Sequence, residues 1–243
     1  MGLVHEFPLS DSGDVVVRIL SDVNGSWGGT CGASLWAAST AAFPWIIATE
    51  ERRCLFKDCA VLELGAGLGL FGIALSKAGA ARATLTDLPL QLPLLQHNIS
   101  SNLDRRSGCT VEARALEWGT PLPAWAASQR WDLIVGADLV YDEAAVPALA
   151  ATLASLLRRS PGARALLALP DRAEFDEPAD GRPDYRVLFD QLSLPEHGCL
   201  AAVQIGCISS EEAGTLESEI HLFLVLQRDE QGEQRDASSS ART

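Results

Sequence analysis

The segment VLELGAGLGLFGIALSKAGAARATLTDLPL, residues 61–90, constrains the fold more than any other stretch of the chain. An apolar run leads into the glycine cluster GAGLG, a helical segment follows at 70–80, and a second apolar run at 83–86 ends beside Asp87. Glycine lets the backbone turn sharply and approach a ligand closely, and the start of a helix offers free amide donors. The segment therefore predicts a strand, a ligand-binding turn, a helix and a second strand.

The alternation of strands and helices continues through the chain. Further strands are predicted at 110–116, 131–140 and 163–170, and helices at 90–102, 143–159 and 184–193. Asp87 is placed to cap the first of these helices. Because the strands are almost wholly apolar and alternate with helices, they predict a doubly wound, mostly parallel sheet of the Rossmann-like α/β class.

The last two apolar runs break this alternation. They lie at 199–208 and 220–228, and only an acidic loop joins them. That loop is too short for a helical crossover, so the runs predict an antiparallel C-terminal strand pair. These runs bring the predicted sheet to seven strands.

The amino-terminal region precedes the first strand of the sheet. Residues 7–20 predict a β-hairpin around Ser12 and Gly13, and residues 35–53 are helical in composition despite Pro44. With 243 residues, 47% of them hydrophobic, the chain fits one domain at 1–228, divided into an amino-terminal segment, residues 1–59, and a core, residues 60–228. The polar, aromatic-free tail at 229–243 is predicted to be disordered.

The charge distribution argues against a nucleic-acid partner. The formal net charge is −13, and the 17 arginines and two lysines are scattered rather than gathered in a stripe. Phosphate neutralisation by a basic patch supplies much of the affinity for nucleic acid. No apolar stretch reaches the roughly 20 residues that cross a bilayer, so no membrane span is expected either.

The cysteine pattern argues against a metal site. Six cysteines occur without a CxxC pair, and the four histidines form no HExxH or local Cys/His cluster. With no secretory signal visible, we expect reduced, mostly buried thiols in the cytoplasm or the nucleus. We also expect the chain to be monomeric.

The glycine cluster by itself is compatible with two kinds of cofactor. Gly67, Gly69 and Gly72 fit the dinucleotide fingerprint GxGxxG, with an acid about 20 residues further on. Three features favour S-adenosylmethionine instead: Glu63 two residues before Gly65, the antiparallel final pair, and an acid at the end of the second strand that can accept both ribose hydroxyls.

Four sequence blocks in order carry a more specific resemblance. They are GASLWAAS; VLELGAGLGLFGIALSKAGA with TDLPLQLPLLQHNISSN; LEWG; and WDLIVGADLVYDE, and together they lie within residues 27–169. The chain resembles the seven-β-strand methyltransferases and, among them, methyltransferase family 16, the non-histone protein lysine methyltransferases. The resemblance implies an S-adenosylmethionine-dependent protein-lysine N-methyltransferase. It also implies a protein substrate that presents a lysine, such as a chaperone or a translation factor.

The resemblance also assigns cofactor-binding residues. It implies that Gly65, Ala66 and Gly67 contact the methionine portion, that Asp87 holds the ribose, and that residues 116–118 flank the adenine. The cofactor-binding residues expected in full are Trp36, Glu63, Gly65, Ala66, Gly67, Asp87, Leu88, Trp118 and Ala137. The alternative roles are a helix cap or a solvated loop acid for Glu63 and Asp87, and core packing for Trp36 and Trp118.

Asp138 and Tyr141 are the predicted catalytic residues. They follow the strand at 131–140 with the spacing Asp-x-x-Tyr, at the carboxyl edge where open α/β sheets bind ligands. We expect Asp138 to orient the incoming amine and Tyr141 to form an aromatic wall beside it. Their alternative roles are helix capping and ordinary packing.

Two functions of other kinds stay open at this point. One is a small-molecule methyltransferase on the same fold, and the other is a catalytically silent interaction module; a nicotinamide-dependent oxidoreductase is a more distant third. The acidic insert from Asp176 to Asp184 departs from the family pattern, so substrate identity is the least transferable element.

Overall fold

A computed structural model describes residues 2–9, 15–22, 25, 27, 31–103, 108–172, 182–198, 200–214 and 218–227. The predicted disordered tail at 229–243, the hairpin turn at Ser12 and Gly13, and most of the insert that ends at Asp184 lie outside the described residues.

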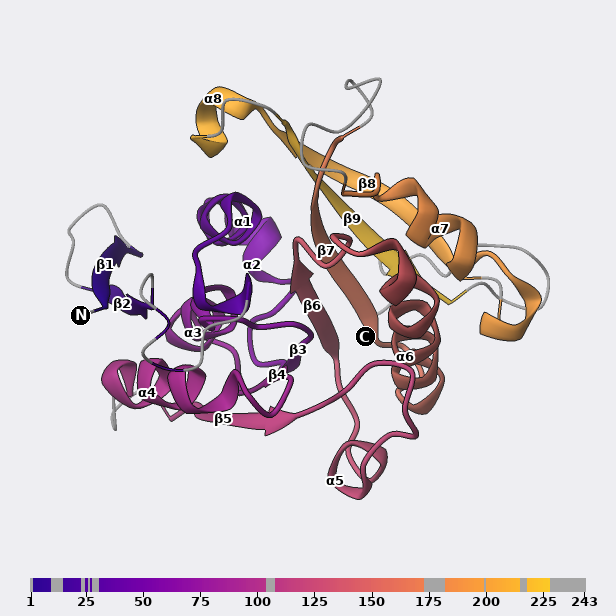
Figure 1. Cartoon of the computed structure of the whole chain (residues 1–243), viewed down its shortest axis with the longest axis horizontal. Helices are drawn as coiled ribbons and strands as arrows, with labels where there is room; N and C mark the ends of the chain where they lie inside the picture. The colour runs from indigo at the N-terminus through magenta and orange to yellow at the C-terminus, as the bar shows by residue number, and fades with distance from the viewer. Residues whose placement is uncertain are drawn as a thin grey trace, which may run out of the picture.

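A seven-stranded sheet with the order β5-β4-β3-β6-β7-β9-β8 forms the centre of the structure (Figure 1). The first five of these strands are parallel, whereas β9 runs antiparallel to both β7 and β8. The strand bounds are β3 Ala60–Glu63, β4 Arg82–Asp87, β5 Thr110–Ala115, β6 Leu133–Ala137, β7 Arg164–Pro170, β8 Ala201–Ile208 and β9 Ile220–Leu226. The predicted Rossmann-like class and the antiparallel C-terminal pair are confirmed.

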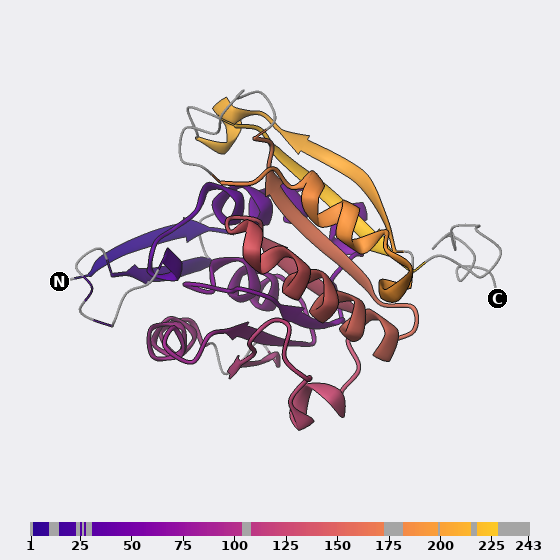
Figure 2. The same cartoon turned by 45° about the vertical axis from the view of Figure 1, so that its right-hand side comes forward.

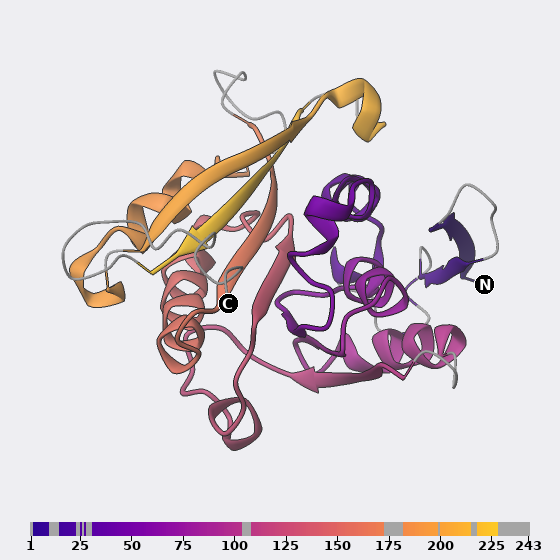
Figure 3. The same cartoon turned by 180° about the vertical axis from the view of Figure 1, so that it is seen from behind.

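Helices cover both faces of the sheet, as the apolar strands require. One face packs against α1, α3 and α4, and the other against α5, α6 and α7. Figure 2 shows α6 and α7 side by side over the second face, and Figure 3 shows the molecule from behind. The helix bounds are α1 Ala37–Ile47, α2 Glu50–Arg53, α3 Leu70–Lys77, α4 Leu92–Asn102, α5 Ala124–Ala127, α6 Val146–Arg159, α7 Arg186–Leu192 and α8 Ser210–Ala213, with short 3-10 turns at Cys31–Ala33, Glu143–Ala145 and Pro195–His197.

The predicted amino-terminal hairpin consists of β1 (Leu3–Pro8) and β2 (Val16–Ser21), paired antiparallel. It lies beside α4 (Figure 1), to which two asparagine side chains attach it. Asn102 Oδ1 accepts the Arg18 N–H at 2.9 Å, and Asn98 Oδ1 accepts the Leu20 N–H at 2.8 Å. These bonds satisfy backbone donors on the outer edge of the hairpin, which fixes its position against the core.

Three sequence predictions are wrong in detail. The helix expected at 35–53 is two helices, because Thr49 leaves the helical conformation and its side chain caps α2. Asp87 does not cap α4: its N-cap residue is Gln91, whose side chain makes no capping bond. The four cysteines whose side chains are described, Cys54, Cys59, Cys109 and Cys207, are free but none is buried, because three of them flank a helix or strand and Cys207 lies on the edge strand β8.

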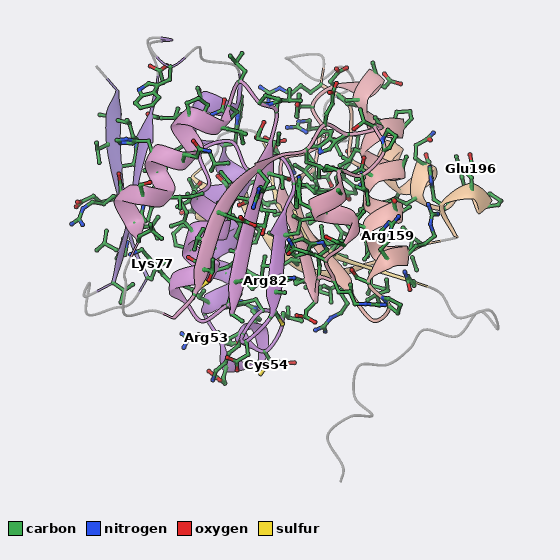
Figure 4. The ribbon with its side chains drawn as sticks, turned by 90° about the horizontal axis from the view of Figure 1, so that it is seen from below. Arg53, Cys54, Lys77, Arg82, Arg159 and Glu196 are labelled. Atoms are coloured by element: carbon green, nitrogen blue, oxygen red, sulfur yellow. The ribbon has the colours of Figure 1, made fainter. Side chains whose placement is uncertain are left out.

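The positive residues labelled in Figure 4 lie away from the edge where the strands end. Lys77 is the last residue of α3 and Arg82 the first of β4, and both lie with Arg53 toward the end of the sheet where the strands begin (Figure 4). Among the described residues, no helix combines the length and apolar character that crossing a bilayer demands.

Candidate active site

A cavity of about 470 Å³ opens at the edge where the parallel strands end. Glu63, Asp87 and Ala137 are the last residues of β3, β4 and β6, which are neighbours in the sheet. All eleven residues that the sequence predicted for the site line this cavity. They are Trp36, Glu63, Gly65, Ala66, Gly67, Asp87, Leu88, Trp118, Ala137, Asp138 and Tyr141.

The glycine turn after β3 brings backbone directly to the cavity wall. Gly65 and Gly67 have φ of +56° and +54°, in the left-handed region that favours glycine. A Cβ on Gly65 would lie 2.8 Å from Leu139 Cδ2 and 3.2 Å from Trp118 Cζ2, and one on Gly67 would lie 3.0 Å from the Gly32 carbonyl oxygen. Side chains at these positions would collide with the cavity wall, so the turn requires glycine at both.

Three of the amide donors in the turn are already bonded to acceptors of the chain itself. The Ala66 N–H donates to Thr86 O, the Gly69 N–H to Ala66 O, and the Gly67 N–H to Asp87 Oδ2 at 2.7 Å. A phosphate site needs such donors directed at the ligand. With a carboxylate occupying the donor of Gly67, the turn disfavours a pyrophosphate and hence the dinucleotide interpretation.

Asp87 lies where an acid can reach the hydroxyls of a ribose. Its second carboxylate oxygen accepts the Leu88 N–H at 2.8 Å, so two backbone bonds fix its orientation toward the cavity. Burial raises the pKa of Asp87, while the N–H groups of Gly67 and Leu88 oppose that rise. Leu88 is 47% exposed beside it, on the cavity wall.

Glu63 combines a cavity position with the capping role considered above. It is buried, and its Oε2 accepts the Gly72 N–H at 3.0 Å in the first turn of α3. Burial raises its pKa to about 8, with the charge of Asp87 adding to the rise and the Gly72 bond opposing it. Glu63 is therefore mainly protonated at neutral pH in the ligand-free chain.

Asp138 is held by a residue to which the sequence assigned no role. Its Oδ1 accepts a bond from Arg172 Nη2 at 2.8 Å, and the two side chains are only 7% and 8% exposed. Arg172 also donates to Val140 O at 2.9 Å, which ties β7 to the loop after β6. Asp138 has φ of +52°, a conformation that aspartate tolerates better than most side chains, and it makes no helix-capping bond that could explain its place.

Aromatic side chains form the remaining walls. Tyr141 is 40% exposed, and Trp36 and Trp118 are half-buried at the cavity rather than enclosed in the core. Arg182, from the described end of the acidic insert, lies over the Trp36 ring with its guanidinium carbon 4.7 Å from the ring centre. No short-range pattern marked Arg172 or Arg182, because both reach the site from beyond the strands that carry its motifs.

Residues 19–178 match the family described as lysine methyltransferase. The chain belongs to this family. The match begins within the amino-terminal hairpin and extends past β7. It therefore includes all the residues that line the cavity except Arg182.

Curated relatives and solved structures agree with the family assignment. The chain is 41% identical over 104 residues to EEF1A lysine methyltransferase 3 of Xenopus tropicalis, covering 43% of this chain and 44% of that protein. It is 38% identical over 124 residues to protein N-lysine methyltransferase METTL21A of the same organism, covering 51% and 54%. Thus the chain spans about half the length of the curated relatives it matches.

The solved structure of a ribosomal protein L11 methylase from Lactobacillus delbrueckii subsp. bulgaricus has a similar fold. The TM-score is 0.52 at 16% identity, over 80% of this chain and 81% of that one. At this identity the similarity supports the fold alone.

Proposed function

We propose that this chain is an S-adenosylmethionine-dependent protein-lysine N-methyltransferase. The observation that carries the proposal is the convergence of Asp87 and Asp138, from the ends of β4 and β6, on one cavity beside a glycine turn. Membership of the lysine methyltransferase family supports the same reaction.

The residues present fit an adenosyl sulfonium ligand. A cavity of about 470 Å³ lies within the range of ordinary small-molecule sites. Asp87 would accept hydrogen bonds from the ribose hydroxyls, while Leu88 and Trp118 would flank the adenine. Gly65 and the neighbouring Glu63 would lie against the methionine portion, because the turn has no side chains in the way and the Asp87 carboxylate on the Gly67 amide suits a cationic group better than a phosphate.

When bound, the donor supplies an electrophilic methyl group on a positively charged sulfur. The chain's own contribution is to hold the lysine nitrogen in line with it and to exclude water, and positioning of this kind can contribute roughly 7–11 kcal/mol. Asp138 would accept a hydrogen bond from the amine, and Tyr141 would form the wall beside it.

The lysine must lose its proton before it can react. With an unperturbed pKa near 10.4, deprotonation at about pH 7.4 costs about 4 kcal/mol. An isolated carboxylate next to the amine would add to this cost by favouring the ammonium form. The ion pair between Arg172 and Asp138 cancels most of that charge while keeping an acceptor in place, so the pair can orient the amine without stabilising its proton.

The distribution of charged side chains between the two ends of the parallel strands supports a basic protein substrate. Asp87, Glu117 and Asp142 line the cavity together with one described cation, Arg182. Glu63 and Asp138 also line it, but Glu63 is mainly protonated and Arg172 balances the charge of Asp138. By contrast, Arg53, Lys77 and Arg82 lie toward the end where the strands begin (Figure 4). Such an arrangement favours approach of a positively charged surface to the cavity. The relative named for the lysine methylation of EEF1A supports a protein target over a small molecule.

Incubation of the full chain with methyl-labelled donor and a cell lysate tests the proposal. We expect label on lysine of a protein band, lost in Asp138→Asn while calorimetry shows that S-adenosylhomocysteine still binds. Glu143→Gln, an exposed acid outside the cavity, is the matched control and should keep the activity. Donor binding without any labelled protein would reject the lysine methyltransferase, label in small molecules would support the alternative enzyme, and absence of binding would support an interaction module.

A further inference from the structure

Three metal-ligating side chains lie together on the C-terminal strand pair, outside the cavity. Cys207 of β8 is directly opposite His221 of β9 in the antiparallel register, and Glu219 precedes His221 by two residues. Since side chains alternate along a strand, all three project from the same face. Cys207 Sγ is 3.2 Å from Glu219 Oε2, which is 3.3 Å from His221 Nε2.

These separations fit the edges of a small coordination polyhedron. The three donor atoms lie within 4.8 Å of one another. Bonds of about 2.0–2.3 Å to one tetrahedral ion place neighbouring ligand atoms roughly 3.3–3.8 Å apart. Small side-chain rotations would bring the three atoms onto one ion, and the fourth position would stay open to water.

The His221 ring is already oriented as a metal-binding histidine needs to be. Its Nδ1 is 3.0 Å from the Tyr185 hydroxyl and 3.6 Å from Asp171 Oδ2, so Nε2 faces Cys207 and Glu219. The ring is 11% exposed and packs against Tyr185 and Phe223. A carboxylate or hydroxyl on the second ring nitrogen fixes the tautomer and raises the basicity of the ligand.

The electrostatic surroundings favour a cation at the thiol. Carboxylates lie around the three donor atoms: Glu219 is itself one of the ligands, and Asp171 Oδ2 lies 3.6 Å from His221 Nδ1. Arg186 offsets some of this negative charge through its ion pair with Asp171. Local negative charge of this kind stabilises a bound divalent ion.

We propose that Cys207, Glu219 and His221 form a binding site for a divalent transition-metal ion, Zn²⁺ foremost, in which Asp171 and Tyr185 orient His221. Thiolate, imidazole and carboxylate together match the borderline-soft character of this ion better than that of Mg²⁺ or Ca²⁺. Binding releases the thiol proton to solvent, and Cys207 coordinates as the thiolate. The ion would link β8 to β9 near the end of β7. This proposal is independent of the proposed methyl transfer.

A titration of the reduced, chelator-treated full chain with Co²⁺ tests this site. We expect one Co²⁺ per chain, with a thiolate-to-metal charge-transfer band in the near ultraviolet and visible bands of tetrahedral intensity, both displaced by Zn²⁺. Cys207→Ser should abolish the charge-transfer band, and Glu219→Gln should weaken Co²⁺ binding at least tenfold. Cys54→Ser is the matched control, because Cys54 is also exposed but lies beside Arg53 at the other end of the sheet (Figure 4).

Cys207 and Glu219 are both exposed, so neither substitution removes core packing. Circular dichroism checks the fold of each variant. A wild-type chain that gives no charge-transfer band would overturn the proposal. A band that persists in Cys207→Ser, or disappears in Cys54→Ser, would place the metal elsewhere and reject the site as well.

Discussion

Arg172 Nη2 lies 2.8 Å from Asp138 Oδ1, and both side chains are more than nine-tenths buried. Asp138 lines the cavity. The two residues come from the ends of neighbouring strands, β7 and β6. Their pairing places a carboxylate at the reaction edge without a net charge. Each partner therefore depends on the other for its place in the fold.

Replacing Arg172 with methionine should destabilise the chain strongly. It leaves the Asp138 carboxylate buried without a counter-charge, which costs roughly 3–5 kcal/mol in proteins. Urea unfolding followed by circular dichroism measures the loss. The double variant Arg172→Met/Asp138→Asn should lose less than Arg172→Met alone, because no buried charge remains.

Arg18→Met is the control for this experiment. Arg18 pairs with Glu6 at 2.7 Å, but both side chains are more than half exposed, so its loss should cost at most about 1 kcal/mol. Equal losses in Arg172→Met and Arg18→Met would contradict the structural role of the buried pair.

Asp87→Ala should weaken S-adenosylhomocysteine binding roughly 10- to 100-fold, because hydrogen bonds to a charged acceptor contribute about 1.5–3 kcal/mol each. Isothermal titration calorimetry gives the dissociation constants. Asp58→Asn changes an exposed acid away from the cavity and should bind as the wild type does. Unchanged affinity in Asp87→Ala would remove the ribose-binding role.

Glu63→Gln should change the pH dependence of stability. The folded pKa of Glu63 is about 8 against an ordinary value of 4.5, so its contribution to stability is fully present below about pH 4.5 and is lost as pH rises to about 8. The glutamine has no such loss. Relative to the wild type, Glu63→Gln should therefore gain stability from pH 5 to pH 8.

Urea unfolding at pH 5, 6.5 and 8 measures this difference. The gain should not exceed about 1.4 kcal/mol per pH unit, the limit for one proton. Asp87 also has a raised pKa and its charge acts on Glu63, so the difference between the two chains includes the loss of this interaction. Parallel stability curves for the two chains would show that Glu63 titrates as an ordinary acid.

Gly67→Ala should reduce both stability and donor binding. A left-handed alanine costs about 1–2 kcal/mol, and here its Cβ would also lie 3.0 Å from the Gly32 carbonyl oxygen. We expect S-adenosylhomocysteine to bind at least tenfold more weakly, because the turn must shift at the cavity wall.

Gly162→Ala separates backbone strain from the effect on the site. Gly162 also has a positive φ, +86°, but no atom lies within 4 Å of a Cβ built there. This variant should lose a similar amount of backbone stability and keep wild-type affinity. Calorimetry measures the S-adenosylhomocysteine affinity of both alanine variants, and urea unfolding measures their stability. Equal affinities in the two variants would mean that the turn does not contact the ligand.

The sequence by itself determined the features that depend on neighbouring residues. Glycines at 65 and 67, apolar runs of strand length and an acid at the end of β4 sufficed for the fold class and for the cavity at the carboxyl edge. Turn chemistry and hydrophobic periodicity act over a few residues, so they can be recognised without knowing what packs against them. The same reasoning from neighbouring residues predicted that Asp87 caps a helix. In the structure its carboxylate accepts the Gly67 N–H instead.

Only the tertiary structure decided which distant residues meet. Arg172 reaches Asp138 because β7 lies next to β6, and Cys207 meets His221 because the register of the antiparallel pair β8 and β9 places these two residues opposite each other. Neither pair has a local spacing that marks it, and the expectation of no metal site rested on local spacing alone. Strand order is set by the burial of whole faces, a property of the assembled sheet, so these pairings follow from packing and not from any short segment.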